Sequence, residues 1–410
     1  MCTDTPQPPA APAGTPPNPP ISVLFAMDAM HGGGAEKVLA DLLKHLDREK
    51  IRPALFVFTR CGAYLENLPP DVPVFALFED PERFRGPQRF LRLAARSIFI
   101  RAAKRLPALM RLAARRAGLP RNFEVGVSFC EGMNLLLLSG APRRFRKKIA
   151  WVHTNMARHK YALGKADFSR AARAMDKIVF VAKSALAVFQ EIFPEIPPRK
   201  LVQIYNPVDV DGIREKAGID TAGKPPQNRP FQILAVGRLE EVKRFDRLLD
   251  AFKLVLGQSV DARLVILGSG GKLAALREHA HKAGVAGNVE FVPFLENPYE
   301  RMARADILVS SSDYEGLPIV ITEAMSLGLP VVATRTTGAG EILNARGGPY
   351  GILTDFTPES LAEGISAMRE SRTLTRFRNS LDAARRGGFF PFGSSTAEIE
   401  RLLLGLGSGA

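Results

Sequence analysis

Two glutamates eight residues apart, Glu315 and Glu323, lie where a strand is expected to turn into a helix. From Ser310 the chain runs through small polar residues to a turn at Gly316, and Pro318 then takes a first helical position, where a missing N–H costs nothing. Free amides and the positive end of such a helix favour a diphosphate. Glu315 is then placed for a sugar hydroxyl, and Glu323 for a ribose diol about 10 Å away.

Two cations are expected at the same edge of the sheet. Arg238 follows Gly237 at the end of an apolar run, and Lys243 stands at the start of the next helix. At the mouth of a parallel sheet, both would neutralise a departing diphosphate. The alternative is that they are ordinary solvated surface charges.

The N-terminal half offers a histidine and a glycine loop. His153 ends a predicted strand at the edge where ligands bind in parallel sheets, although a lone histidine is more often structural. Gly33 and Gly34 follow the first strand and let a ligand approach the backbone closely. Glu36 and Lys37 stand where the third glycine of a dinucleotide fingerprint would fall, which disfavours a nicotinamide enzyme.

The elements that must position these residues are short apolar runs alternating with helical stretches, which is typical of doubly wound parallel sheets. Gly, Pro, Asn and Gln between Gly218 and Pro230 break the alternation and mark a linker. We therefore predict an α/β chain of two tandem Rossmann-like domains that face each other across a cleft. The predicted strands are 21–27, 54–58, 123–129, 148–153, 178–182, 201–205, 231–236, 263–267, 288–293, 305–310, 330–333 and 350–353.

The expected domain boundaries follow from that alternation. Residues 21–209 are expected to form the N-terminal domain, and 210–385 the C-terminal domain. Residues 1–20 are a Pro-rich tail whose composition cannot bury enough surface to become ordered. A helix within 386–410 is free to pack back on the N-terminal domain.

Taken together, these pieces resemble glycosyltransferase family 4, the retaining enzymes of the two-domain GT-B fold. The stretch around Glu315 is most similar to bacterial members that build surface polysaccharide and lipopolysaccharide. The matching elements occur in the family's order and cover nearly everything after residue 20. They are Gly33-Gly34-Ala35-Glu36, Asn206-Pro207-Val208-Asp209, Val236-Gly237-Arg238 with Lys243, Glu315-Gly316-Leu317-Pro318 through Glu323-Ala324, Gly328 to Thr334, and Gly340-Glu341.

The resemblance implies that the N-terminal domain (21–209) binds the acceptor and the C-terminal domain (210–385) binds the nucleotide-sugar. It also implies a role for each matching residue. The donor diphosphate would be held by Arg238 and Lys243, and the ribose by Glu323. The transferred sugar would contact Glu315, the Gly316 and Leu317 amides, and His153, while the Gly33-Gly34 loop lies between donor and acceptor. The nucleotide, which we expect to be UDP, is a co-substrate, and neither a cofactor nor a metal is expected. Because the family has no established protein nucleophile, stabilising the leaving diphosphate is the main catalytic contribution.

Residues 83–121 carry almost all of the chain's net charge of +14, because they contain 11 Arg, one Lys and no acidic residue. Leu91, Ile98 and Leu106 share one helical face, with Arg92 among the residues off that face. A basic amphipathic helix suits an anionic membrane surface or a lipid diphosphate. The alternative is a core-packed helix with a solvated basic side. Nucleic acid is disfavoured, because no known reading motif accompanies the charge.

These observations favour a metal-independent retaining glycosyltransferase that moves a hexose or N-acetylhexosamine to a lipid-linked or lipopolysaccharide-type acceptor. Asp209-Val210-Asp211 mimics a metal-binding motif, but its place at the domain junction indicates a hinge. We expect a cytoplasmic protein at the inner face of the cytoplasmic membrane, since the sequence shows no signal peptide and three scattered cysteines. Two alternatives are a nucleotide-sugar epimerase, for which only His153 is a candidate acid or base, and a non-catalytic scaffold.

Overall fold

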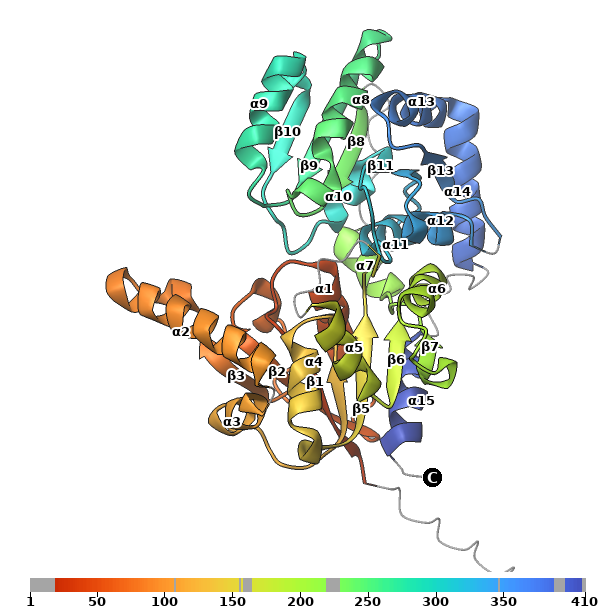
Figure 1. Cartoon of the computed structure of the whole chain (residues 1–410). Coiled ribbons are helices and arrows are strands. Elements are labelled where there is room, and N and C mark those ends of the chain that lie inside the picture. Colours follow the sequence, from red (N-terminus) through yellow and green to blue (C-terminus); the bar gives the residue numbers. More distant parts are fainter. Residues whose placement is uncertain are drawn as a thin grey trace, which may run out of the picture.

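A computed structural model shows two α/β domains, one above the other in Figure 1. It describes residues 19–106, 108–154, 156–157, 164–218, 229–345, 347–386 and 395–407. Most of the expected Pro-rich tail over 1–20 therefore lies outside the described residues, as does most of the expected linker between Gly218 and Pro230.

The N-terminal domain is built on a seven-stranded parallel sheet in the order β3-β2-β1-β4-β5-β6-β7. Its strands are nearly continuous apolar runs, as expected for a sheet that helices cover on both faces. The order reverses between β1 and β4, and ligands bind at such reversals in open α/β sheets. The strands are β1 (Ile21–Met27), β2 (Ile51–Arg60), β3 (Val74–Glu79), β4 (Phe123–Ser128), β5 (Phe145–Val152), β6 (Lys177–Phe180) and β7 (Leu201–Gln203).

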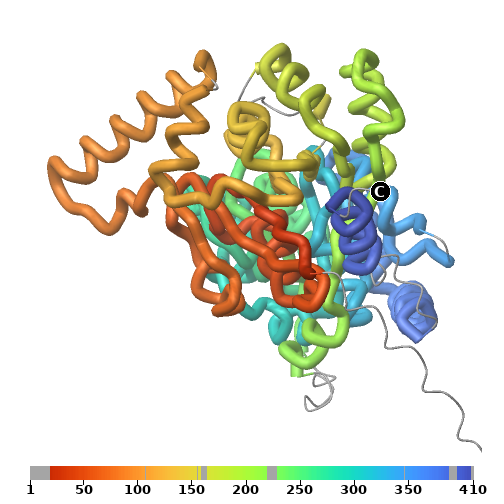
Figure 2. The backbone as a smooth tube through the Cα atoms, turned by 90° about the horizontal axis from the view of Figure 1, so that it is seen from below, coloured from red at the N-terminus to blue at the C-terminus, as the bar shows by residue number. Residues whose placement is uncertain are grey.

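Helices connect these strands and cover the sheet. The connection from β3 to β4 is the longest and contains two helices, the first of which extends away from the rest of the domain (Figures 1 and 2). The described helices of this domain are α1 (Gly34–His45), α2 (Gly86–Arg105), α3 (Leu109–Arg116), α4 (Met133–Gly140), α5 (Lys165–Arg173) and α6 (Lys183–Ile192), with 3₁₀ turns at Ala63–Leu65, Pro81–Arg83, Pro142–Arg144 and Pro198–Lys200. The next helix, α7 (Val210–Ala217), packs on helices of the C-terminal domain.

The C-terminal domain repeats the same strand order on a six-stranded parallel sheet, β10-β9-β8-β11-β12-β13. Its reversal lies between β8 and β11. The strands are β8 (Phe231–Val236), β9 (Ala262–Leu267), β10 (Val289–Val292), β11 (Ile307–Ser310), β12 (Val331–Thr334) and β13 (Gly351–Thr354). The helices are α8 (Phe245–Gly257), α9 (Leu273–Ala283), α10 (Tyr299–Arg304), α11 (Ile319–Ser326), α12 (Thr337–Leu343), α13 (Pro358–Arg369) and α14 (Ser371–Arg386), with 3₁₀ turns at Glu241–Lys243 and Ala286–Asn288.

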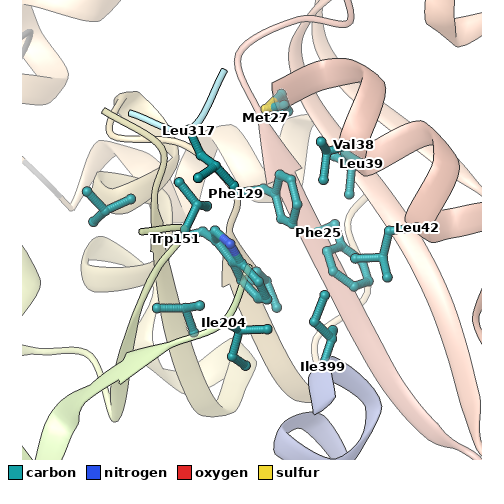
Figure 3. Packing of buried hydrophobic residues seen from close by; sticks show 14 of the residues in the cluster. Phe25, Met27, Val38, Leu39, Leu42, Phe129, Trp151, Ile204, Leu317 and Ile399 are labelled. Atoms are coloured by element: carbon teal, nitrogen blue, oxygen red, sulfur yellow. The ribbon is translucent and has the colours of Figure 1, made fainter. Parts of the chain in front are cut away.

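The last described helix, α15 (Ser395–Gly407), returns to the N-terminal domain and packs against β1, β4 and β5. Its Glu400 accepts a hydrogen bond from the Asp47 amide at 2.8 Å. Figure 3 shows Ile399 of α15 and Leu317 of the C-terminal domain among the buried side chains around Phe25 and Trp151. The apolar core of the N-terminal domain is therefore completed by residues from the far end of the chain.

The predicted architecture is confirmed, and the deviations are local. Strand β3 was not predicted, and β2 is longer than expected at both ends. Pro318 precedes α11 as its N-cap instead of forming its first residue. The predicted apolar face of α2 is divided: Leu91 and Ile98 are exposed, whereas Ala103 of the same predicted face is buried, with Phe99 partly buried against the core.

Candidate active site

Glu315 and Lys243 form an ion pair at the edge of the C-terminal sheet. Lys243 Nζ lies 2.5 Å from Glu315 Oε1, and Ser312 Oγ donates to the same oxygen at 2.7 Å. Both charged side chains are mostly buried but retain some exposure. Gly237 supports this geometry, since a Cβ there would lie 3.3 Å from Lys243 Cε. The structure thus brings together two residues that the sequence placed at one ligand.

Arg238 lies apart from this pair. It is exposed and its Nη1 donates to Glu240 Oε1 at 2.7 Å, on the surface beyond β8. A surface pair of this kind contributes little to stability, so its rearrangement toward an anion costs little. The role of Arg238 at a diphosphate stays a prediction.

Two arginines hold the loop that carries Glu315, namely Arg247 of α8 and Arg244, the N-cap residue of that helix. Arg247, which is buried, donates to Asp313 Oδ1 at 2.5 Å and to the Ser311 carbonyl at 2.8 Å. Arg244 pairs with Asp313 Oδ2 at 3.2 Å. These charge-assisted bonds hold the strand-to-helix turn in one conformation, which is a requirement for a preorganised site.

Gly316 packs directly on the N-terminal domain. A Cβ at Gly316 would overlap the carbonyl of His153, and a Cβ at Gly338 would overlap the carbonyl of Gly316. The glycine is therefore required by the close approach of two backbones, one from each domain. Leu317 is buried beside it, and its side chain belongs to the shared apolar core.

His153 directly follows β5, and Glu131 holds its backbone. Its backbone amide and that of Thr154 donate to Glu131 Oε1, at 2.5 and 2.7 Å. Its ring lies 5.0 Å from that of Phe129, and burial lowers the pKa of His153 to about 4 although Glu131 opposes the shift. The imidazole is therefore neutral at ordinary pH and cannot serve there as a proton donor of the imidazolium type.

Glu323 is buried in a network that links the two domains. Its Oε1 accepts from Tyr299 at 3.0 Å and lies 3.0 Å from Lys37 Nζ of α1, which also reaches Asp41 at 2.9 Å. Burial alone would lower the pKa of Lys37, but Glu323, Tyr299 and Asp41 together raise it well above the usual value. The sequence did not indicate that Lys37 belongs to the site. A ribose bound at Glu323 would share the Glu323 carboxylate with Lys37.

The glycine loop of the N-terminal domain, Gly33 and Gly34, lies against α11, the helix that carries Glu323. A Cβ at Gly34, the first residue of α1, would meet the side chain of Ile319 at 3.4 Å. Gly33 is similarly confined by the carboxylate of Glu36. The structure therefore places this loop at the start of α11, next to the turn that carries Glu315.

A further carboxylate joins the domains. Glu341 of α12 accepts from the Lys183 amide at 2.8 Å, the Ser184 amide at 3.1 Å and the Tyr205 hydroxyl at 2.8 Å. It therefore caps the first turn of α6 from the other domain, where a negative charge also complements the helix dipole.

Asp209 caps a helix. It accepts from the Gly212 amide at 2.9 Å at the start of α7 and lies 3.5 Å from His45 Nε2. Within the described residues, no three His, Cys, Asp or Glu side chains are grouped as a metal site would need. No helix in that part of the chain has the length and apolarity to cross a membrane.

The chain matches two family models, one over each domain. Residues 32–211 match the model for Glycosyltransferase Family 4, and residues 220–386 match that for Glycosyl transferases group 1. The chain belongs to glycosyltransferase family 4. Both the glycine loop and the Glu315–Glu323 turn lie within the matched regions, one in each domain.

Two relatives of this family 4 chain are named for a diphospho-undecaprenol and a phosphatidylinositol dimannoside. The N-acetylgalactosamine-N,N'-diacetylbacillosaminyl-diphospho-undecaprenol 4-alpha-N-acetylgalactosaminyltransferase of Campylobacter jejuni is 30% identical over 44% of this chain and 47% of its own length. A GDP-mannose-dependent phosphatidylinositol dimannoside mannosyltransferase of Mycobacterium tuberculosis is 31% identical over 33% of this chain and 35% of its own. The chain thus spans a third to a half of the length of these curated relatives.

Solved structures share the fold over almost the whole family 4 chain. HepE of Anabaena, in complex with UDP and glucose, has a TM-score of 0.68 at 18% identity, covering 95% of this chain and 100% of its own. WaaG, a glycosyltransferase involved in lipopolysaccharide biosynthesis, has a TM-score of 0.66 at 17% identity, covering 93% and 99%. These neighbours establish the two-domain GT-B architecture.

Proposed function

We propose that this protein is a retaining, metal-independent glycosyltransferase that moves a hexose or N-acetylhexosamine from a UDP-linked donor to a lipid-linked or lipopolysaccharide-type acceptor. The observation that carries the proposal is the Lys243–Glu315 ion pair at the start of α11, with Gly316 against His153 and Glu323 farther along the same helix. The crystallised complex of HepE with UDP and glucose supports UDP as the nucleotide.

In the proposed reaction, the acceptor oxygen forms a bond to the anomeric carbon while the bond from that carbon to the donor phosphate oxygen breaks. The electron pair leaves with the nucleoside diphosphate, and the hydroxyl proton passes to the departing phosphate on the same face of the sugar. Lys243, Arg238 and the first amides of α11 stabilise the negative charge that develops there. Glu315 holds sugar hydroxyls and also keeps the Lys243 ammonium in place.

The acceptor is expected at a membrane surface. Six of the eight large apolar side chains that are exposed in the described residues lie between residues 83 and 121. They are Phe90, Leu91, Leu93, Ile98, Leu106 and Leu112. Arginines surround them, so the segment combines apolar insertion with attraction to anionic lipid. We propose that it docks the protein on the inner face of the cytoplasmic membrane, beside a lipid-linked acceptor.

The decisive experiment measures nucleotide release from UDP-, GDP- and ADP-sugars, with and without EDTA and membrane extract. The wild type is compared with Glu323→Ala and with the control Glu363→Ala, which removes an exposed glutamate of α13. We expect one donor to be turned over in the presence of EDTA, to require the extract, and to be lost only in Glu323→Ala.

Each other outcome changes the proposal in a defined way. Loss of turnover with EDTA contradicts metal independence. Interconversion of the donor sugar without transfer supports the epimerase alternative. If no nucleotide sugar binds or turns over, the protein is a scaffold and the enzyme assignment is wrong.

A further inference from the structure

The N-terminal sheet has its own ligand-binding edge, and Asp28 lies at its centre. Asp28 directly follows β1, and Glu131 and Gly132 follow β4, so the three residues flank the point where the strand order reverses. In open α/β sheets this reversal is where ligands bind. The corresponding reversal of the C-terminal sheet, between β8 and β11, is followed by Arg238 and by the Glu315 turn.

Asp28 is fixed in this position by its neighbours. The Met133 amide, at the start of α4, hydrogen-bonds to it. A Cβ at Gly132 would lie 2.5 Å from Asp28 Oδ2, so a glycine is needed for the carboxylate to lie against this turn. The side chain keeps an exposed face and forms no ion pair in the described part of the chain. The carboxylate is thus held in place and still available to a ligand.

A short series of contacts connects Asp28 to Gly316 of the C-terminal domain. Gly132 touches Asp28, its neighbour Glu131 binds the His153 and Thr154 amides, and His153 contacts Gly316. β1 and β5 are separated only by β4, and neighbouring strands lie about 4.8 Å apart, so Asp28 is about 10 Å from the end of β5.

Arg96 of α2 faces the same place. It acts electrostatically on Asp28 without a direct ion pair. Its Nε is buried and, among the described residues, has no hydrogen-bond partner. A buried donor without a partner is costly, and a ligand that carries an anionic group would satisfy it. Arg96 therefore connects this edge to the helix whose outer face is apolar and exposed.

We propose that Asp28 and Arg96 form the acceptor subsite, in which Asp28 accepts a hydrogen bond from the attacking hydroxyl and Arg96 binds the phosphate of a sugar-diphosphate lipid. The proposal rests on the proposed function and specifies its acceptor chemistry. A neutral glycoside would satisfy Asp28 alone, whereas a diphosphate-linked sugar would satisfy both residues. With α2 on the membrane surface, Arg96 also lies on the side from which a lipid-linked phosphate would arrive.

The ionisation of Asp28 gives this subsite a pH dependence. Although one side of the carboxylate is exposed, the surrounding protein removes part of its hydration, and this desolvation raises the pKa of Asp28 to about 6; Arg96 and the Met133 amide lower the pKa, and Glu36 raises it. These are the charged groups of α1 and α2 and the amide of α4 that face the carboxylate. Because the ionised form accepts the hydroxyl better, acceptor binding should rise as the pH increases through about 6.

The test uses the full chain at saturating UDP and two defined probes. One is N-acetylglucosamine linked through a diphosphate to undecanol, and the other is undecyl N-acetylglucosaminide, which lacks the diphosphate. Their dissociation constants are measured between pH 5 and 8 for the wild type, Asp28→Asn, Gly132→Ala and Arg96→Ala. Arg101→Ala, which removes an exposed charge from the same helix, is the matched control.

We expect the wild type to bind the diphosphate probe at least tenfold more tightly than the neutral one, and Arg96→Ala to abolish that difference. Asp28→Asn should weaken both probes and remove the pH dependence of binding, because the amide cannot ionise. Gly132→Ala should weaken binding in the same direction, and Arg101→Ala should change little.

The proposal is overturned if the wild type does not bind the diphosphate probe, or if Asp28→Asn and Arg96→Ala bind both probes as the wild type does. UDP binding, measured in parallel, distinguishes failure of the acceptor subsite from failure of the proposed function. Unchanged UDP affinity in all variants leaves the donor site standing whatever the acceptor result. Failure of the wild type to bind UDP contradicts the proposed function itself.

Discussion

The proximity of Glu315 and Lys243 was predictable from single residues, whereas the contacts of Glu323 with the other domain were not. Glu315, Lys243 and Glu323 stand next to recognisable strand-to-helix turns, so their chemistry can be inferred from type and position. Lys37 looks like any helix-surface lysine in the sequence, and Asp28 like any aspartate after a strand. Their importance arises only when the chain folds, because the groups they face come from distant segments.

The Lys37–Glu323 pair gives a prediction about stability. Lys37→Met leaves a buried carboxylate with Tyr299 as its remaining partner, so the free energy of unfolding should fall by about 3 kcal/mol. Adding Glu323→Gln should recover part of that loss, because the uncompensated charge is then gone. Urea denaturation of the two single variants and the double variant measures the coupling.

Lys44→Met, on an exposed face of α1, is the control and should change stability by less than about 0.5 kcal/mol. The pair should be insensitive to pH between 6 and 9. A lysine with a raised pKa contributes stability below its unfolded pKa, 10.5, and loses it only as the pH rises through the higher folded value. Equal stability of Lys37→Met and the wild type would show that the pair contributes nothing.

At the scale of elements, α2 shows where sequence patterning reaches its limit. The pattern of apolar residues predicted a helix, and α2 is one. Periodicity identifies an apolar face but does not say what covers it, and here the exposed face carries Leu91 and Ile98 while Ala103 meets the core. The exposed apolar side chains are what distinguish a helix that meets a membrane from one with a solvated basic side.

Replacing Leu91 and Ile98 by serine should reduce binding to anionic vesicles at least tenfold, because both side chains would otherwise enter the lipid interface. Co-sedimentation with vesicles of phosphatidylcholine and phosphatidylglycerol measures this. Wild-type binding should also weaken in 0.5 M salt, through screening of the arginines. Leu254→Ser, an exposed leucine of α8, is the control. Equal binding to purely zwitterionic vesicles would contradict the role assigned to the basic charge.

For the whole molecule, the two-domain architecture was predictable because strand and helix alternate twice with a polar break between them. What the alternation does not predict is how the domains are held together. The Glu341 cap on α6 and the Gly316–His153 contact join residues whose proximity depends on the relative placement of two complete domains. No local pattern in either half specifies that placement.

The return of α15 to the N-terminal domain gives a prediction at this scale. Ile399 and Leu403 are completely buried, so changing both to serine should remove about 3 to 6 kcal/mol from the N-terminal domain. Calorimetry should show the N-terminal transition at a lower temperature and the C-terminal transition unchanged. Arg401→Ser, on the exposed side of α15, should leave both in place. A shift of the C-terminal transition alone would show that α15 stabilises the C-terminal domain and would contradict this prediction.

The same return of the chain has a consequence for synthesis in the cell. Domains generally fold one after another as they leave the ribosome, the N-terminal one first. Here the surface of β1, β4 and β5 that α15 covers stays open until residues 395–407 have been translated. The N-terminal domain therefore has an uncovered apolar surface while the residues before α15 are being synthesised. Nascent chains stalled before residue 395 should consequently be the preferred targets of holding chaperones.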